Sequence, residues 1–143
     1  MKVSAKAEYA CLAMLELAAH FGTGEPVRIG KIADEHGIPS RFLVQILLQL
    51  KGAGFVASTR GASGGYQLIK PPDEISLGQV MNVIEGDETS TVSSATIGTG
   101  ASSRVLRSAW QEVAQAQRET LSAITFGDLV ARIKRQTENM YYI

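Results

Sequence analysis

Residues that can read DNA bases recur at helical spacing in the segment that begins at Ser40. Arg41, Val44, Gln45 and Leu48 fall on one face of a helix drawn through this segment. In the major groove, arginine can donate two hydrogen bonds to guanine, glutamine can pair with adenine, and an apolar group can contact the thymine methyl. The spacing therefore predicts a recognition helix in which Arg41 and Gln45 read bases.

A glycine-rich turn follows this segment and carries its own hydrogen-bond donors. Arg60 precedes Gly61, Gly64 and Gly65 in a turn between two short apolar runs. Glycine backbone can approach a partner closely, and the arginine and hydroxyl side chains beside it can donate to phosphates or reach the minor groove. We therefore expect a hairpin tip that contacts DNA beside the recognition helix.

The predicted DNA-contacting set combines these two features with nearby basic and aromatic residues that suit phosphate contacts. Taken singly, each of these residues could equally be an ordinary surface residue that contacts only solvent, and this alternative stays open. The combination of helix and hairpin is more specific than either alone. The set consists of Lys2, Lys6, Tyr9, Arg28, Ser40, Arg41, Phe42, Val44, Gln45, Gln49, Lys51, Ser58, Thr59 and Arg60.

Apolar periodicity assigns the elements that must position these residues. Residues 4–21 are apolar nearly all round, which predicts a helix buried on most sides. Residues 29–36 and 40–51 predict two short amphipathic helices joined by a tight turn, with Ser40 as the N-cap of the second. Strand candidates flank the glycine turn on both sides. Helix, helix-turn-helix and hairpin in this order make a winged helix, so the predicted fold class is mainly α with a small β-hairpin wing.

The second half of the chain predicts further helices around a polar loop. Residues 76–85 begin with a capping box of Ser76 and Gln79, and residues 125–128 repeat that pattern before a final helix. Between them, residues 103–124 place side chains seven apart, as in a paired helix. This spacing predicts a long C-terminal dimerisation helix whose contact residues are Leu106, Trp110, Val113, Gln117, Thr120 and Ile124.

Charge is divided unevenly along a chain whose total is neutral. The sequence holds 14 Lys and Arg against 14 Asp and Glu. Residues 1–70 contain eight basic and five acidic side chains, whereas residues 71–143 contain six basic and nine acidic ones. The net charge of +3 therefore lies on the half that contains the predicted recognition helix. Such asymmetry suits a polyanionic partner on one side of the molecule.

The sequence also disfavours several classes of protein. The one cysteine, Cys11, cannot form a disulfide within the chain, and together with two histidines it is too little for a typical structural zinc site. No nucleophile–base pair can be argued from these residues, so an enzyme is not expected. The sequence shows neither an apolar run of about eighteen residues nor a signal peptide, which predicts a cytoplasmic protein without a membrane partner.

Several runs of the sequence resemble one known family. The run from Arg60 to Tyr66 is the most distinctive, and it is similar to the wing of the Rrf-two family of winged helix-turn-helix bacterial transcription regulators. The resemblance implies a homodimeric DNA-binding regulator, usually a repressor, whose long C-terminal helix crosses to the partner subunit. The resemblance also implies which residues lie at positions that the family uses around DNA, namely Arg41, Phe42, Val44, Gln45 and Arg60. At Val44 the sequence departs from the polar residue of some members. The other similar runs are 9–18, 42–47, 75–80 and 124–129, together with Trp110.

The resemblance implies a cofactor that this sequence does not fit. Many members of the family hold an iron–sulfur cluster on three cysteines in the loop before the long helix, with an acid or a histidine as the fourth ligand. The matching cysteine positions fall near Val92, Gly98 and Arg104, and the histidine position falls at Arg107. Glu8 matches the acidic alternative, but without thiolates it is a single hard oxygen ligand. We therefore expect no cofactor and no metal site.

These observations predict a sequence-specific transcription regulator, a repressor that binds double-stranded DNA as a homodimer on a pseudo-palindromic operator. A winged-helix module that binds protein stays open as an alternative, as does a regulator with a protein or small-molecule effector. The predicted division of the chain is 1–72 for the winged helix-turn-helix, 73–85 for a linking helix, 86–102 for a flexible sensor-type loop, and 103–143 for the dimerisation helix and the C-terminal helix.

Overall fold

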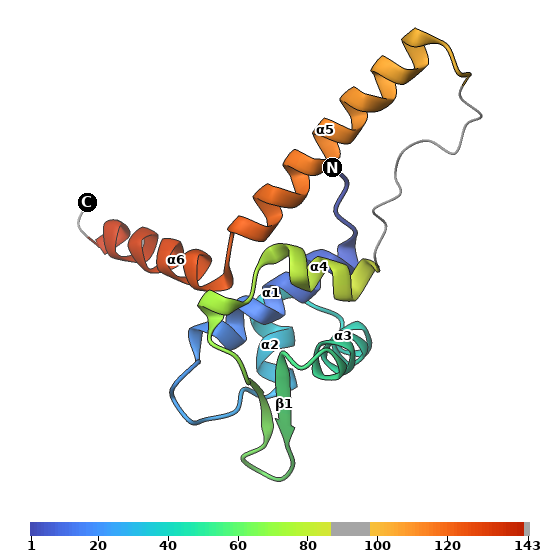
Figure 1. Cartoon of the computed structure of the whole chain (residues 1–143). Helices are drawn as coiled ribbons and strands as arrows, with labels where there is room; N and C mark the ends of the chain where they lie inside the picture. The colour runs from blue at the N-terminus through green and yellow to red at the C-terminus, as the bar shows by residue number, and fades with distance from the viewer. Residues whose placement is uncertain (87–97, 142–143) are drawn as a thin grey trace.

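The computed structural model describes residues 1–86 and 98–141, and Figure 1 shows how their elements are arranged. Over these residues the fold is mostly helical with one two-stranded antiparallel sheet, which confirms the predicted fold class. The elements in chain order are α1 (Ala5–Ala19), α2 (Ile29–His36), α3 (Ser40–Gly52), β1 (Val56–Thr59), β2 (Gly65–Leu68), the short 3-10 helix η1 (Pro72–Glu74), α4 (Leu77–Glu85), α5 (Ala101–Ala123) and α6 (Phe126–Tyr141).

The hydrophobic core is centred on α1, which packs against α2, α3, α4 and α6. The buried face of α1 includes Ala7, Ala10 and Ala13, and these small side chains let the neighbouring helices approach closely. Phe126, the first residue of α6, is the largest fully buried side chain among the described residues. The first turn of α6 is thereby fixed to the body, while its later residues 131–140 are exposed.

The helix-turn-helix forms at the predicted residues, with one difference at the start of α3. Gly37 ends α2 in the left-handed conformation with φ 63°, which glycine adopts without strain. We expected Ser40 to cap α3, but Pro39 occupies the N-cap position with φ −58° and ψ 129°. The Pro39 carbonyl accepts hydrogen bonds from the N–H groups of Phe42 and Leu43. Ser40 is therefore the first helical residue, and the predicted cap was wrong.

The predicted hairpin is present, and its base is joined to the segment before α2. β1 and β2 pair in antiparallel fashion with Val56 opposite Leu68. Beside the hairpin, Val27 and Tyr66 exchange two backbone hydrogen bonds of 2.8 Å. A Cβ atom at Gly65 would overlap the backbone of Val27, so this close approach requires glycine. The wing is thus anchored to the helix-turn-helix at its base and free at its tip.

Two capping boxes lie side by side where α4 and α6 begin. Ser76 and Gln79 exchange hydrogen bonds of 3.2 Å and 2.8 Å at the start of α4. Thr125 and Asp128 exchange bonds of 3.1 Å and 3.0 Å at the start of α6, and the bonds from Thr125 lower the pKa of the Asp128 carboxyl. Ser76 and Thr125 also pair as a β-bridge. Both predicted capping relations are confirmed, and the bridge joins them.

The α5 helix projects away from the body, with its C-terminal end beside α4 (Figure 1). It begins at Ala101, two residues before the predicted start, so residues 101–102 are helical instead of part of the predicted loop. Most of that loop, residues 87–97, lies outside the described residues. Although α5 has 23 residues, neither it nor any other helix in the described part of the chain is apolar enough to cross a membrane.

Candidate nucleic-acid interface

The α3 helix is fixed by one face and presents the other to solvent. Its apolar residues at spacings of three and four lie on one side, where each is fully buried against the core. The buried side chains are Leu43, Ile46, Leu47 and Leu50. The exposed side, which we call the outward line, consists of Arg41, Val44, Gln45 and Leu48. A helix packed in this way holds its outward line at a fixed orientation.

Aromatic side chains support the N-terminal end of the outward line. The rings of Tyr9 from α1 and Phe42 from α3 lie 6.4 Å apart between their centroids. The guanidinium carbon of Arg41 lies 5.5 Å from the centroid of the Phe42 ring, which is within the range of a cation–π contact. Phe42 therefore joins α1 to α3 and positions the Arg41 side chain at the exposed surface.

The wing is joined to the opposite end of α3. Lys51 Nζ donates a hydrogen bond of 2.8 Å to Ser58 Oγ on β1. Beyond this contact Thr59 and Arg60 are exposed, and Gly61 adopts φ 108°, a conformation that favours glycine. The structure thus places four members of the predicted set, Lys51, Ser58, Thr59 and Arg60, close together from the end of α3 onto the wing.

Lys2 and Lys6 lie at the N-terminal end of α1. Lys6 is half-buried and precedes Tyr9 by about one helical turn. Lys2 precedes Ser4, the N-cap of α1, whose N–H and hydroxyl donate to Glu85 Oε1 at 3.2 Å and 2.7 Å. These two hydrogen bonds tie the start of α1 to the end of α4. Figure 1 shows the N-terminus on the side of the body that faces away from the wing.

Three members of the predicted set differ in their accessibility. Arg28 and Ser40 are exposed, at the N-terminal ends of α2 and α3 respectively. Gln49 is half-buried, and its Oε1 atom is enclosed without a hydrogen-bond partner among the described residues. Gln49 is therefore less accessible than the residues of the outward line, although it lies on the same helix.

A polar network between α1 and α2, which was not expected from the sequence, holds the first helix of the helix-turn-helix. His20 Nδ1 lies 2.9 Å from the carbonyl oxygen of Glu16 and 3.2 Å from its carboxylate. The same carboxylate lies 3.3 Å from His36 Nε2, and Lys31 Nζ lies 3.2 Å from His20 Nε2. These contacts link the end of α1 to both ends of α2 through the two histidine rings.

Five of the six predicted dimerisation residues lie on α5, and the sixth, Ile124, is the C-cap residue of that helix. Leu106, Trp110 and Val113 are each more than half exposed, and the neighbouring Val105, which was not predicted, is 70% exposed. Gln117 and Thr120 are also exposed. Ile124 differs, because it is half-buried and its carbonyl accepts a hydrogen bond of 2.9 Å from the α4 backbone. We call Val105, Leu106, Trp110 and Val113 the apolar face of α5.

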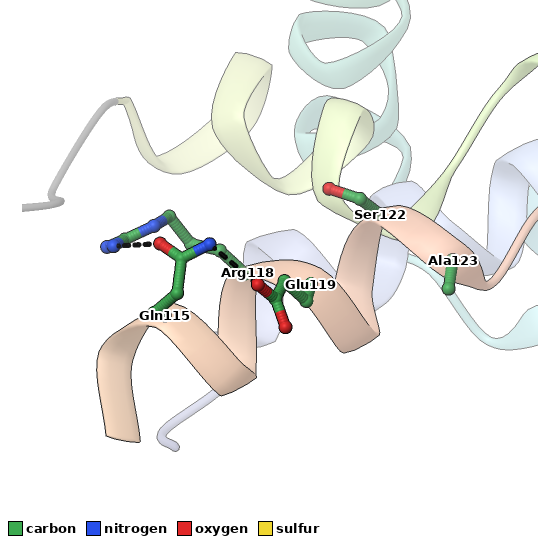
Figure 2. A pocket seen from close by; sticks show the side chains of 5 residues that line it. All are labelled: Gln115, Arg118, Glu119, Ser122 and Ala123. Atoms are coloured by element: carbon green, nitrogen blue, oxygen red, sulfur yellow. Dashed lines mark hydrogen bonds between the residues drawn. The ribbon is translucent and has the colours of Figure 1, made fainter. Parts of the chain in front are cut away.

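A polar trough with a volume of about 450 Å³ lies along the C-terminal half of α5, and Figure 2 shows its lining. Gln115 Oε1 accepts a hydrogen bond of 2.7 Å from Arg118, and Gln115 Nε2 donates one of 2.9 Å to Glu119. Ser122 and Ala123 complete the lining. All five residues come from one helix, and three of them bond to one another. The trough is therefore a feature of the helix surface and not an enclosed ligand site.

The residues present do not fit an iron–sulfur cluster. A cluster needs several thiolates, and Cys11 on α1 is the one cysteine of the sequence. Burial and the carboxylates of Glu85 and Glu8 raise the pKa of this thiol to about 11, which disfavours the ligating thiolate. Within residues 1–86 and 98–141, no group of three His, Cys, Asp or Glu side chains could hold a metal ion. The family's cysteine position near Val92 lies outside the described residues.

Comparisons with known sequences agree with this architecture. The family model Rrf2, described as an iron-dependent transcriptional regulator, matches residues 3–132. The HTH-type transcriptional regulator IscR of Aliivibrio salmonicida is 34% identical over 131 residues, which cover 91% of this chain and 77% of IscR. The HTH-type transcriptional regulator CymR of Bacillus subtilis is 33% identical over 144 residues, which cover 100% of both chains.

Solved structures of regulators of this family are also similar to the chain. The structure of CymR, the global cysteine regulator of B. subtilis, matches with a TM-score of 0.82 and 32% identity over 92% of this chain and 98% of CymR. IscR from T. potens matches with a TM-score of 0.75 and 34% identity over 93% of this chain and 88% of IscR. The resemblance noted in the sequence is therefore confirmed. The chain belongs to the Rrf2 family of winged-helix transcriptional regulators, which are DNA-binding proteins and not enzymes.

Proposed function

We propose that this member of the Rrf2 family is a repressor that binds a pseudo-palindromic operator as a homodimer, without an iron–sulfur cluster. The observation that carries the proposal is a pair of exposed surfaces at different places in the molecule. The outward line of α3 and the wing offer hydrogen-bond donors to DNA, whereas the apolar face of α5 offers contacts to a second chain.

The outward line is proposed to read bases in the major groove. Arg41 and Gln45 have the side chains that pair with guanine and adenine, and both are exposed near the N-terminal end of α3. Arg60 is exposed at the wing, where it can reach a phosphate or the minor groove. The proposed supporting contacts to the DNA backbone are Lys2, Lys6, Tyr9, Arg28, Ser40, Phe42, Lys51, Ser58 and Thr59. Val44 and Gln49 complete the proposed set on the recognition helix, where they face the groove.

The apolar face of α5 is proposed to pair with the same face of a second chain. An exposed tryptophan flanked by leucine and valine leaves apolar area in water, and pairing about a two-fold axis removes this area from both chains. The proposed contact set is the predicted one, Leu106, Trp110, Val113, Gln117, Thr120 and Ile124. Two-fold symmetry in the protein requires two related half-sites, about one turn of DNA or a multiple of it apart.

Repression is the simplest outcome of such binding. A dimer that covers two half-sites in a promoter blocks other proteins from that DNA without needing a further contact. In a reporter assay, deletion of the gene should therefore raise expression from the bound promoter. Lower expression after deletion would contradict the repressor part of the proposal.

The proposed DNA binding does not depend on iron, because one cysteine cannot supply the thiolates of a cluster. Anaerobically purified protein should contain no stoichiometric iron or sulfide and should lack a broad visible charge-transfer absorption. A preparation that shows this absorption together with stoichiometric iron would contradict the cluster-free part of the proposal.

Fluorescence anisotropy titrations test the central part of the proposal. The full chain is titrated with a fragment of its own promoter and with a scrambled duplex of the same length and composition. We expect binding to the promoter to be tighter by a factor of about 1,000 or more. Arg41→Ala and Gln45→Ala should each lose about 1–3 kcal/mol and relax specificity, because each removes a base contact.

Lys6→Ala serves as the matched control, since a phosphate contact carries no sequence information. It should weaken binding to both duplexes alike and reduce the dependence of affinity on salt. Equal affinity of the wild-type chain for both duplexes, unaltered by Arg41→Ala, would contradict the proposed function.

A further inference from the structure

Two apolar side chains stand on the outward line of α3, where a solvated helix face would carry polar ones. Val44 is 41% exposed and Leu48 is 55% exposed, whereas Leu43 and Leu47, each one residue earlier, are fully buried. Val44 and Leu48 therefore add little to the core of the described residues. Together with Phe42, which is also 41% exposed, they place apolar area in the middle of the surface that is proposed to meet DNA.

The geometry of the helix limits what this pair can reach. Val44 and Leu48 lie one turn apart, and four residues of helix rise about 6 Å. Successive bases along one DNA strand are separated by about 3.4 Å, so the two side chains can reach groups within about two base-pair steps of each other. Gln45 follows Val44 on the same line, so a base that Gln45 reads has an apolar side chain close to it.

The chemistry of the major groove identifies the matching group. The apolar group that DNA presents there is the methyl at C5 of a pyrimidine, which thymine carries and which methylated cytosine also carries. Glutamine pairs with adenine, and each adenine lies opposite a thymine whose methyl points into the same groove. A line that combines Gln45 with apolar neighbours is therefore complementary to A·T pairs.

We propose that Val44 and Leu48 read the C5-methyl groups of thymines in each half-site, within about two base-pair steps of the pair read by Gln45. The inference rests on the proposed function, in which α3 enters the major groove. It makes Val44 and Leu48 determinants of specificity beside the hydrogen-bonding pair Arg41 and Gln45. One methyl group buried in this way corresponds to about a fourfold change in affinity.

The test uses the full chain and the promoter fragment that it protects in a footprint. Each thymine of a protected half-site is replaced in turn by uracil, which lacks only the C5-methyl group and keeps the hydrogen-bonding edges. Anisotropy titrations should show about fourfold weaker binding at one or two positions. Val44→Ala should remove the sensitivity to uracil at one of these positions, and Leu48→Ala should remove it at the other.

Two controls separate methyl reading from other effects. Ile69→Ala removes an apolar side chain that is 57% exposed but lies outside the outward line, and it should keep the full sensitivity to uracil. Duplexes with cytosine or 5-methylcytosine in place of a sensitive thymine distinguish the two sources of the methyl group. Tighter binding to the 5-methylcytosine duplex supports methyl reading, whereas a natural site that binds only when its cytosines are methylated contradicts thymine as the source.

The outcomes distinguish this inference from the proposed function. Specific binding that no uracil substitution weakens overturns the inference and leaves the proposed function intact. Val44→Ala and Leu48→Ala variants that keep full affinity and full sensitivity to uracil also overturn it, and they would assign the patch to a protein partner. No preference of the wild-type chain for its promoter overturns both.

Discussion

The helices α3 and α5 are both amphipathic, but only α3 buries its apolar face within one chain. Four apolar side chains of α3 are fully buried in the core, whereas α5, which is described along its whole length, has no buried side chain. The body around α1 is thus held by contacts of the chain with itself. The apolar face of α5 stays exposed in one chain, and in the proposed function a second chain covers it.

Charge is divided differently from the apolar contacts. The net +3 lies on residues 1–70, which contain α3 and the wing, whereas the acidic excess of the second half lies in residues 71–100, before α5 begins. The α5 helix itself carries three arginines and two glutamates. Figure 1 shows the wing and the free end of α5 pointing in opposite directions from the body. A basic excess on the half that carries α3 and the wing suits contact with phosphates, so the neutral total is compatible with a DNA-binding protein.

The largest expected effect comes from removing a buried side chain of α3. Leu47→Ala should lower the free energy of unfolding by about 2–5 kcal/mol, because it leaves a cavity in the core. Urea denaturation followed by circular dichroism measures this change. The control is Leu48→Ala, one residue along on the exposed side, which should cost less than about 1 kcal/mol. If the two variants lost the same free energy of unfolding, the assignment of a buried and an exposed face to α3 would be contradicted.

Thiol chemistry gives a second contrast between the two regions. Burial and nearby carboxylates raise the pKa of Cys11 from 9.0 to about 11, so at pH 8 its thiolate fraction falls to about a hundredth of that of an ordinary cysteine. Alkylation by iodoacetamide should therefore be about 100-fold slower in the folded protein than in the unfolded one. The raised folded-state pKa also means that this group stabilises the fold fully below pH 9 and loses that contribution as the pH rises toward 11.

A cysteine placed on α5 provides the control for that experiment. In the Cys11→Ala background, Glu112→Cys puts a thiol at an exposed position of α5, and it should react at nearly the same rate in folded and unfolded protein. Fast alkylation of Cys11 in the folded wild-type chain would contradict its burial in the body.

Dimer formation tests the role proposed for the exposed apolar face of α5. Trp110→Ala should weaken the homodimer by about 2 kcal/mol, or roughly 30-fold in the dissociation constant, because buried tryptophans contribute strongly to interfaces. Sedimentation equilibrium measures this change. Glu112→Ala on the same helix should leave the constant nearly unaltered. A wild-type chain that stays monomeric at micromolar concentration would remove the proposed reason for the apolar face of α5.

The smallest expected effect concerns the capping box at the start of α4, where Ser76 also pairs with Thr125. Ser76→Ala removes one side of the capping box at the start of α4 and should lower the free energy of unfolding by about 1 kcal/mol. Thermal denaturation measures the loss. Thr137→Ala removes a hydroxyl that bonds within α6, away from any cap, and should have a smaller effect. A larger loss for Thr137→Ala would contradict the role assigned to the cap.

The wing and the helix-turn-helix were predictable because local patterns encode them. The glycines after Arg60 indicated the hairpin, and the buried and exposed residues of α3 follow one helical period. The N-cap of α3 was missed because Ser40 and Pro39 both suit that end of the helix, and the proline took the cap position. The early start of α5 at Ala101 has a similar reason, since serines at 102–103 favour a cap as well as a first turn.

Long-range pairs were not predictable from local patterns. Glu16 and His36 are twenty residues apart, and no period in the sequence connects them. The pairing of Val27 with Tyr66 is a single β-bridge, which is too short to leave an alternating pattern. The burial of the side-chain amide oxygen of Gln49, Oε1, depends on the packing around α3. The sequence showed only that this residue is polar.

Native mass spectrometry of the protein bound to its promoter duplex tests the central claim most directly. The claim is that residues 1–72 contact DNA while α5 joins two chains. The account predicts a complex of two chains with one duplex and no mass from iron or sulfide, and it predicts that Trp110→Ala shifts this complex toward one chain per duplex. A wild-type complex with one chain per duplex, or no complex at all, would contradict it.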